Sequence, residues 1–92
     1  MNVAMPAPTT TMIELTSAKA LGKAIREART RSGLRQAEAA HLCGVGIRYL
    51  SDLENGKETV RLEQALKVIA GLGLVLTIGP KKPFWSKDGR AA

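Results

Sequence analysis

The chain has 92 residues, enough for one small domain with a single modest core. Its 14 Lys and Arg residues outnumber its 8 Asp and Glu residues, which gives a formal net charge of +6. This excess favours a polyanion or an acidic protein surface as the partner. The single cysteine, Cys43, excludes an internal disulfide and indicates a cytoplasmic protein.

Several function classes are disfavoured by what the sequence lacks. No nucleophile–base set, metal-ligand set or phosphate loop is apparent, so we expect no enzyme activity, no cofactor and no metal. The longest apolar stretch, "VIAGLGLVLTIG", is too short and too rich in glycine to span a bilayer. The N-terminus has no basic region followed by an apolar core, so it does not read as a signal peptide.

Three segments differ in composition. Residues 1–16 contain two prolines and a threonine run, which predicts a flexible arm whose end is tethered to the core through Ile13 and Leu15. Residues 17–79 carry the periodic apolar pattern of a folded domain. Residues 80–92 are basic and interrupted by proline, which predicts a flexible tail.

The folded segment begins with a helix. Ser17 is a favourable N-cap, and the helical pattern that follows it stops at Gly33. Within this helix Leu21, Ile25 and Ala28 recur at helical spacing and form one apolar stripe.

Two short helices are expected next, with a glycine turn between them. The first covers residues 35–43 and is closed by Gly44. The second covers residues 46–55, with Leu50 and Leu53 facing inward. A helix this short is marginal on its own in water, so the scaffold must hold it.

The domain ends with a fourth helix and a short strand. The helix is expected near residues 60–73, and its apolar stripe consists of Leu62, Ala65, Leu66, Ile69 and Leu72. Residues 74–79, "LVLTIG", suit a strand better than more helix because Val75 and Ile78 are β-branched.

Four short helices with a tight glycine turn between the second and third describe a helix-turn-helix. Gly44 can adopt the left-handed conformation that ends one helix, and Gly46 then starts the next helix close to the turn. A short braced helix with a free face fits the major groove of DNA. The free face consists of Ile47, Arg48, Ser51 and Asp52.

The stretch "LRQAEAAHLCGVGIRYLSDLENGK" resembles the Xre-type helix-turn-helix domain of lambdoid phage repressors, with a match over residues 21–74. The resemblance implies a mainly all-α fold, a lambda-repressor-like domain of four to five helices. It also implies that Gln36 contacts a phosphate, and that Arg29 and Glu54 form a buried ion pair between the first and third helices. The sequence departs from the family at Gly46, where Ser, Thr or Lys is common.

A narrower resemblance covers "GVGIRYLSDLENGKETVRLEQALKVIAGLGLVLTI", which is similar to the HipB-type antitoxins. It implies that the short C-terminal strand pairs with its copy to form a homodimer. It also implies repression of the protein's own operon through a palindromic operator, and binding to a kinase-fold toxin of the HipA type. The dimer interface would then consist of Leu74, Val75, Leu76, Thr77 and Ile78.

The side chains expected to contact DNA begin the second helix, line the free face of the third, or follow it. Arg48 suits a guanine through its bidentate fork, or a phosphate, or it is a solvated charge. Ile47 suits a thymine methyl group, and Tyr49 suits packing or a phosphate better than a base. Asp52 suits a cap, a pair with Arg48 or a cytosine amino group. The full set is Arg35, Gln36, Gly46, Ile47, Arg48, Tyr49, Ser51, Asp52, Asn55 and Lys57.

Two of the three aromatic residues, Phe84 and Trp85, stand together in the basic tail. One interpretation is a tail folded onto the domain's own surface. The other is an anchor for a pocket on the toxin, because aromatic residues dominate binding hot spots.

Two alternatives to a DNA-binding antitoxin stay open. One is a stand-alone regulator of the phage-repressor or restriction-modification controller type, with no toxin partner. The other is an adaptor that has lost DNA binding, which the basic and polar set Arg35, Gln36, Arg48 and Lys57 argues against. The strand and the aromatic tail favour the antitoxin over the stand-alone regulator.

Overall fold

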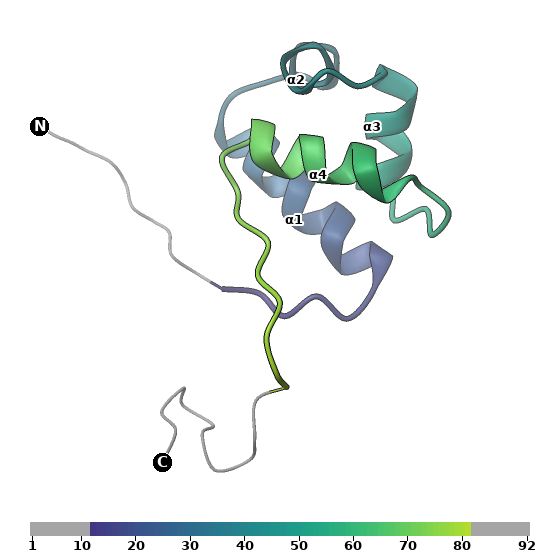
Figure 1. Cartoon of the computed structure of the whole chain (residues 1–92). Helices are drawn as coiled ribbons and strands as arrows, with labels where there is room; N and C mark the ends of the chain where they lie inside the picture. The colour runs from purple at the N-terminus through teal and green to yellow at the C-terminus, as the bar shows by residue number, and fades with distance from the viewer. Residues whose placement is uncertain (1–11, 82–92) are drawn as a thin grey trace, which may run out of the picture.

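The computed structural model describes residues 12–81 (Figure 1). The helices in this range are α1 (Ala18–Arg31), α2 (Gln36–Cys43), α3 (Ile47–Glu54) and α4 (Leu62–Gly71). They confirm the predicted all-α helix-turn-helix architecture, with ends within a few residues of those expected. None of these helices is both long and apolar enough to cross a membrane.

The ends of α1 follow from local chemistry. The Ser17 hydroxyl accepts a hydrogen bond from the Ala20 N–H at 3.0 Å, which satisfies one of the donors left free at a helix start. At the other end the chain turns at Gly33, where φ is +75°, a conformation that favours glycine. Both boundaries therefore come from residues that the sequence alone identifies.

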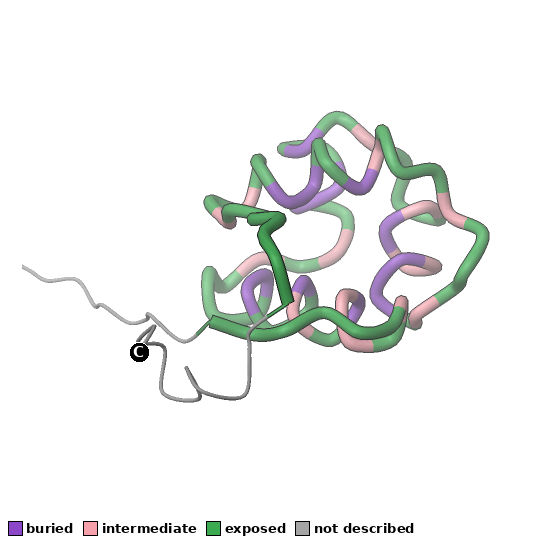
Figure 2. Tube along the Cα trace, turned by 60° about the horizontal axis from the view of Figure 1, so that its bottom comes forward, coloured by how far each residue is buried: buried purple, intermediate pink, exposed green. Residues whose placement is uncertain are grey.

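The core is small and draws on all the helices. Its largest fully buried side chains are Ile25 of α1, Leu50 and Leu53 of α3, and Val68 of α4. Small residues of α2 fill the space between them, and Figure 2 shows the buried stretches turned toward the centre of the molecule. Because these α2 residues are small, α2 packs closely against both α3 and α4.

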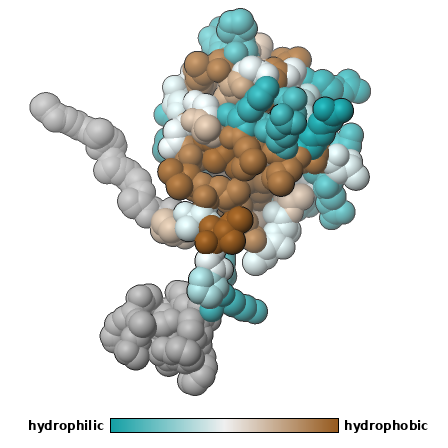
Figure 3. Space-filling view, in the orientation of Figure 1, coloured by the Kyte–Doolittle hydropathy of each residue, from teal (hydrophilic) through white to brown (hydrophobic). Residues whose placement is uncertain are grey.

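The predicted stripe on α4 was partly wrong. Leu62 and Leu66 are 67% and 44% exposed, whereas Val68, which the predicted stripe omitted, is fully buried. The core-facing residues are Ala65, Val68 and Ile69, which share one side of the helix. α4 is apolar on more than one side, and Figure 3 shows an apolar band over this face of the molecule. The helical period alone does not identify the side that faces the chain's own core.

Residues 74–79 form no strand within the part of the chain that the structure describes. The Leu74 N–H bonds the Ile69 carbonyl at 2.9 Å, and the chain then runs on without regular structure. Val75 and Ile78 are 86% and 90% exposed. A strand requires a backbone partner, so the predicted pairing with a second copy stays a prediction, as does the division of the chain at residues 16 and 80.

The backbone of α1 lies directly against the end of α3. At Gly22, which is buried, an added Cβ would lie 2.4 Å from the Leu53 carbonyl oxygen and 2.7 Å from that of Glu54. Backbone atoms cannot rotate away from such a contact as a flexible side chain can. Glycine at this position therefore sets how closely the two helices approach.

We expect Gly22→Ala to destabilise the domain by about 1–3 kcal/mol, the usual cost of overpacking. The direction is informative because alanine normally stabilises a helix interior by about 1 kcal/mol relative to glycine. Urea denaturation followed by circular dichroism measures the change. A Gly22→Ala variant that is as stable as the parent protein, or more stable, would contradict the close approach.

Candidate nucleic-acid interface

The turn between α2 and α3 occupies residues 44–46. Gly44 ends α2 with φ +75° and ψ +31°, the left-handed conformation, and the Val45 N–H bonds the Ala40 carbonyl at 3.0 Å. Val45 packs against the core, so the turn is anchored. Gly46 has φ −75° and an added Cβ there would meet nothing within 4 Å. The turn therefore requires glycine at position 44 but not at position 46.

α3 has one buried side and one free side. Leu50 and Leu53 are 0% and 2% exposed and fix the helix to the core. On the other side Ile47 is 51% exposed and Arg48 is exposed, while Ser51 is half-buried. Figure 1 shows α3 at the edge of the molecule, with its length inclined steeply to α2. α3 is thus a short, fixed helix with an accessible outer face.

A buried ion pair ties the end of α3 to α1. The guanidinium of Arg29 donates through Nε to Glu54 Oε2 at 2.6 Å and through Nη2 to Oε1 at 2.9 Å. The two side chains are 11% and 1% exposed. The hydrogen bond to Glu54 raises the pKa of Arg29, and burial opposes this increase. Two parallel bonds to one carboxylate fix the relative position of the helices as well as their separation.

The same carboxylate also holds the start of α2. Gln36 Nε2 donates to Glu54 Oε1 at 3.0 Å, and Arg29 Nη1 donates to the Leu34 carbonyl at 2.8 Å. Since a carboxylate only accepts, the Gln36 amide must turn its NH₂ group inward. A phosphate at this position could then use the second Nε2 hydrogen and the backbone N–H groups that begin α2. The sequence indicated the Arg29–Glu54 pair through the resemblance, but not this third partner.

A residue outside the predicted set also shapes the start of α2. The Glu38 carboxylate accepts a hydrogen bond from the Arg35 N–H at 2.8 Å, half of a capping box. The usual sequence signal for this motif needs Ser or Thr at the N-cap, and arginine stands there instead. Glu38 adds negative charge at the positive end of α2, while the exposed Arg35 side chain offsets it.

Other predicted interface residues have partners within the protein. The Tyr49 hydroxyl donates to the Arg61 carbonyl at 2.6 Å, and burial raises the pKa of Tyr49. Asp52 lies 3.5 Å from Lys57 Nζ, so its ion pair is with Lys57 rather than Arg48. Both side chains of this pair are partly exposed, and such pairs contribute about 0–1 kcal/mol. Tyr49 is therefore held in place by the chain that precedes α4.

The contact between Gln36 and Glu54 places the start of α2 beside the end of α3. Arg35 directly precedes Gln36, and Asn55 and Lys57 follow Glu54 in the chain; all three side chains are exposed. Arg48 is at the other end of α3, about 9 Å from Glu54 along the helix axis. No ion pair or side-chain hydrogen bond joins Arg48 to another residue within 12–81.

A family match accounts for this arrangement. The profile of the helix-turn-helix family HTH_3 matches residues 25–76, which include α2, the turn and α3. The chain belongs to the helix-turn-helix family. A curated relative from Sinorhizobium fredii (strain NBRC 101917 / NGR234), an uncharacterized HTH-type transcriptional regulator named y4mF, is 40% identical over 58 residues. That match covers 63% of this chain and 76% of the relative.

Solved structures resemble this helix-turn-helix protein over their whole length. A complex of a HipB variant with an O2 20mer aligns with a TM-score of 0.71 and 26% identity, over 78% of this chain and 100% of that chain. A HipA–HipB–O2–O3 complex aligns with a TM-score of 0.71 and 25% identity, over 77% of this chain and 100% of the matched chain. The resemblance to HipB is therefore found in structure as well as in sequence.

We expect Arg29→Met to lower the free energy of unfolding by about 3–5 kcal/mol, because it leaves the Glu54 carboxylate buried without its cation. The double variant Arg29→Met with Glu54→Leu should lose less, since no unpaired charge remains. Urea denaturation measures both. Arg31→Met removes an exposed arginine two residues away and should change stability by less than about 0.5 kcal/mol. If Arg29→Met were as stable as Arg31→Met, the ion pair of Arg29 and Glu54 would not hold the helices together.

Proposed function

We propose that the protein is a sequence-specific DNA-binding repressor that binds a palindromic operator as a homodimer. The observation that carries the proposal is that α3 is held rigidly while one of its faces stays exposed. Leu50 and Leu53 fix the helix to the core, and the buried ion pair of Glu54 with Arg29 fixes its end. A rigid helix with a free polar face is the form in which helix-turn-helix proteins enter the major groove. The net charge of +6 favours approach to DNA.

Contacts to the DNA backbone would come from the start of α2 and from the residues that follow α3. At the start of α2, backbone N–H groups, the second Gln36 amide hydrogen and Arg35 can converge on one phosphate. Beyond α3, Asn55 and Lys57 are both exposed and suit the DNA backbone. These contacts fix the register of α3 in the groove but do not read the sequence.

Base contacts would come from the first turns of α3. Arg48 is exposed and not committed to another described side chain, so its bidentate fork is available for guanine. Ile47 presents an apolar surface that suits a thymine methyl group. Ser51 can donate to or accept from several bases. Asp52 is engaged with Lys57, which favours a supporting role for both side chains.

The homodimer is proposed to form through residues 74–79. This segment leaves Val75 and Ile78 almost fully exposed, an unfavourable arrangement for an isolated soluble domain. Pairing the segment with its copy covers these side chains and supplies backbone partners. A two-fold dimer then presents two copies of α3 to half-sites whose centres lie about 34 Å apart, or a multiple of that distance.

We further propose that the protein acts as the antitoxin of a kinase toxin of the HipA type and regulates its own operon. The similarity to a chain in a HipA–HipB complex supports this, together with the adjacent Phe84 and Trp85. These aromatic residues lie outside the described part of the chain. Their proposed role is to anchor the basic tail in a pocket of the toxin, because buried aromatic side chains carry much of the energy of an interface.

Arg48→Ala should weaken binding to the operator by about 1–3 kcal/mol while leaving non-specific binding nearly unchanged, as expected for a residue that reads a base. Gln36→Ala should weaken binding to all sequences alike, because a phosphate contact carries no sequence information. Shift assays at fixed salt measure both effects.

Arg26→Ala is the matched control for these DNA experiments, since it removes an exposed arginine from α1. The control should leave both the specific and the non-specific affinity nearly unchanged. The proposed docking fails if Arg48→Ala and Gln36→Ala behave like the control at several salt concentrations.

Val75→Asp combined with Ile78→Asp should convert the dimer to a monomer, because two charges would be placed in an apolar contact. Light scattering at micromolar concentration gives the mass of each form. Leu42→Asp is the matched control, as Leu42 is also exposed, at 60%, but lies on α2. A monomeric parent protein would reject the proposed homodimer.

Deleting residues 80–92 tests the proposed toxin anchor. The proposed partner, a kinase toxin of the HipA type, should lose binding to the shortened protein, while operator binding is retained. Phe84→Ser with Trp85→Ser should reproduce this loss, since it keeps the basic charges of the tail. Lost DNA binding with intact toxin binding would instead make the tail a nucleic-acid arm. Titration calorimetry with the purified partner and with operator DNA separates the two results.

A further inference from the structure

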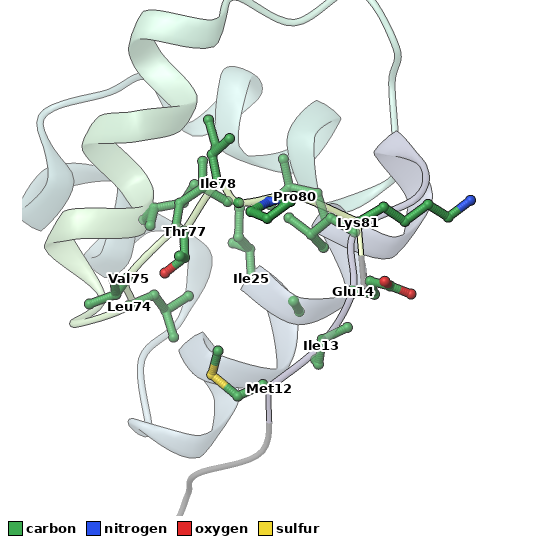
Figure 4. Close-up of a pocket in the computed structure, with 16 residues that line it drawn as sticks. Met12, Ile13, Glu14, Ile25, Leu74, Val75, Thr77, Ile78, Pro80 and Lys81 are labelled. Carbon is green, nitrogen blue, oxygen red and sulfur yellow. The ribbon is translucent and has the colours of Figure 1, made fainter. Parts of the chain in front are cut away.

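An apolar groove of about 560 Å³ separates two parts of the chain that are far apart in sequence (Figure 4). One wall is formed by residues 12–15, which precede α1, and the other by residues 74–81, which follow α4. Between them lie Ile25 and Ile69. The figure shows Glu14 and Lys81 extending away from the groove at one end, so the interior is apolar and the charges are at the rim.

The backbone of both walls is unpaired with other main-chain groups in the part of the chain that the structure describes. Among the described residues, no backbone N–H or C=O group of residues 12–16 or 75–81 is hydrogen-bonded to another main-chain group. Main-chain bonding begins at Ser17, whose carbonyl accepts the first bond of α1. An occupant that covers this groove must therefore offer apolar side chains together with backbone donors and acceptors. An extended polypeptide meets both requirements, whereas a helix uses its backbone groups internally.

We propose that the groove takes residues 74–79 of a second copy of this chain. The inference rests on the proposed homodimer and specifies its interface. The partner's segment would lie between residues 12–15 and residues 74–79 of this chain. In a two-fold dimer the reverse contact also forms. The result is a four-stranded sheet in which the N-terminal segment of each chain pairs with the C-terminal segment of the other.

The composition of residues 74–79 suits this position. The segment has no charged residue, in a chain whose net charge is +6, so it enters an apolar groove without desolvating a charge. Val75, Leu76 and Ile78 are exposed, and in the proposed sheet a neighbouring strand would lie along each edge of their segment. Adjacent strands in a sheet lie about 4.8 Å apart. A strand therefore fits between the two walls of the groove only if the walls are separated by about twice that distance.

The size of the interface also favours a contact broader than one pair of strands. A stable dimer typically uses about 20–30 residues on each side. Residues 74–79 fall well short of this, whereas 16 residues line the groove. Including residues 12–15 brings the interface close to the usual size and covers Ile13, which is 54% exposed.

Crosslinking between differently tagged copies tests the arrangement in the full-length protein. One copy carries Ile13→Cys and the other Thr77→Cys, both with Cys43→Ala so that no native thiol remains. A short bis-maleimide should join the two tags in mixed dimers. When both cysteines are placed in one copy, diluted with an excess of cysteine-free protein, the yield of links within that copy should be low. Links that form mainly within the doubly substituted copy would overturn the inference.

The strength of dimerisation provides the second measurement. Ile13→Ser with Leu15→Ser should raise the dimer dissociation constant by more than about tenfold, since each loses buried apolar surface. Leu62→Ser, an exposed leucine on α4 that does not line the groove, is the matched control. If the double change left the dimer dissociation constant unchanged, the proposed strand arrangement would be overturned, but the proposed homodimer would still stand. A parent protein that is monomeric by light scattering would overturn both.

Discussion

The carboxylate of Glu54 is the interaction on which the rest of the interface depends. It accepts two hydrogen bonds from Arg29 of α1 and one from Gln36 of α2, while it belongs to α3 itself. One buried group thus fixes three helices relative to one another. Because α3 has only eight residues, its position depends on such contacts and on its two buried leucines, rather than on its own helical stability.

A buried ion pair of this kind contributes more to geometry than to stability. The desolvation of both charges offsets most of their attraction, so an apolar replacement of both side chains can be equally stable. It would not reproduce the directional bonds that turn the Gln36 amide and hold the Leu34 carbonyl. We therefore interpret the cluster as the contact that sets the position of the start of α2, where a phosphate contact is proposed, relative to the outer face of α3. That register is what a helix needs in order to enter the groove in a single orientation.

The sequence predicts the helices well because their signals are local. Ser17 caps α1, Gly44 ends α2 in the left-handed conformation, and the apolar residues of α3 recur at the helical period. The stripe of α4 was partly mispredicted because Leu62 extends the same pattern without facing the core. The bond from Gln36 to Glu54 joins residues 18 positions apart, so it depends on how the helices pack and no local pattern encodes it. The bond from Tyr49 to the Arg61 carbonyl was missed for the same reason.

The two sides of the domain place different demands on its chemistry. The face around α3 is polar and can remain in contact with water, whereas the groove beside residues 74–79 is apolar and its walls have no main-chain partner within residues 12–81. The core is limited: much of it consists of alanines, and among the described residues only Ile25, Leu50, Leu53 and Val68 are large and fully buried. A small core leaves little stability in reserve. Covering the groove with a second copy would add apolar burial and would fix the distance between two copies of α3. Protein concentration would then control both the folding stability and the proposed operator recognition, because both would depend on the same association.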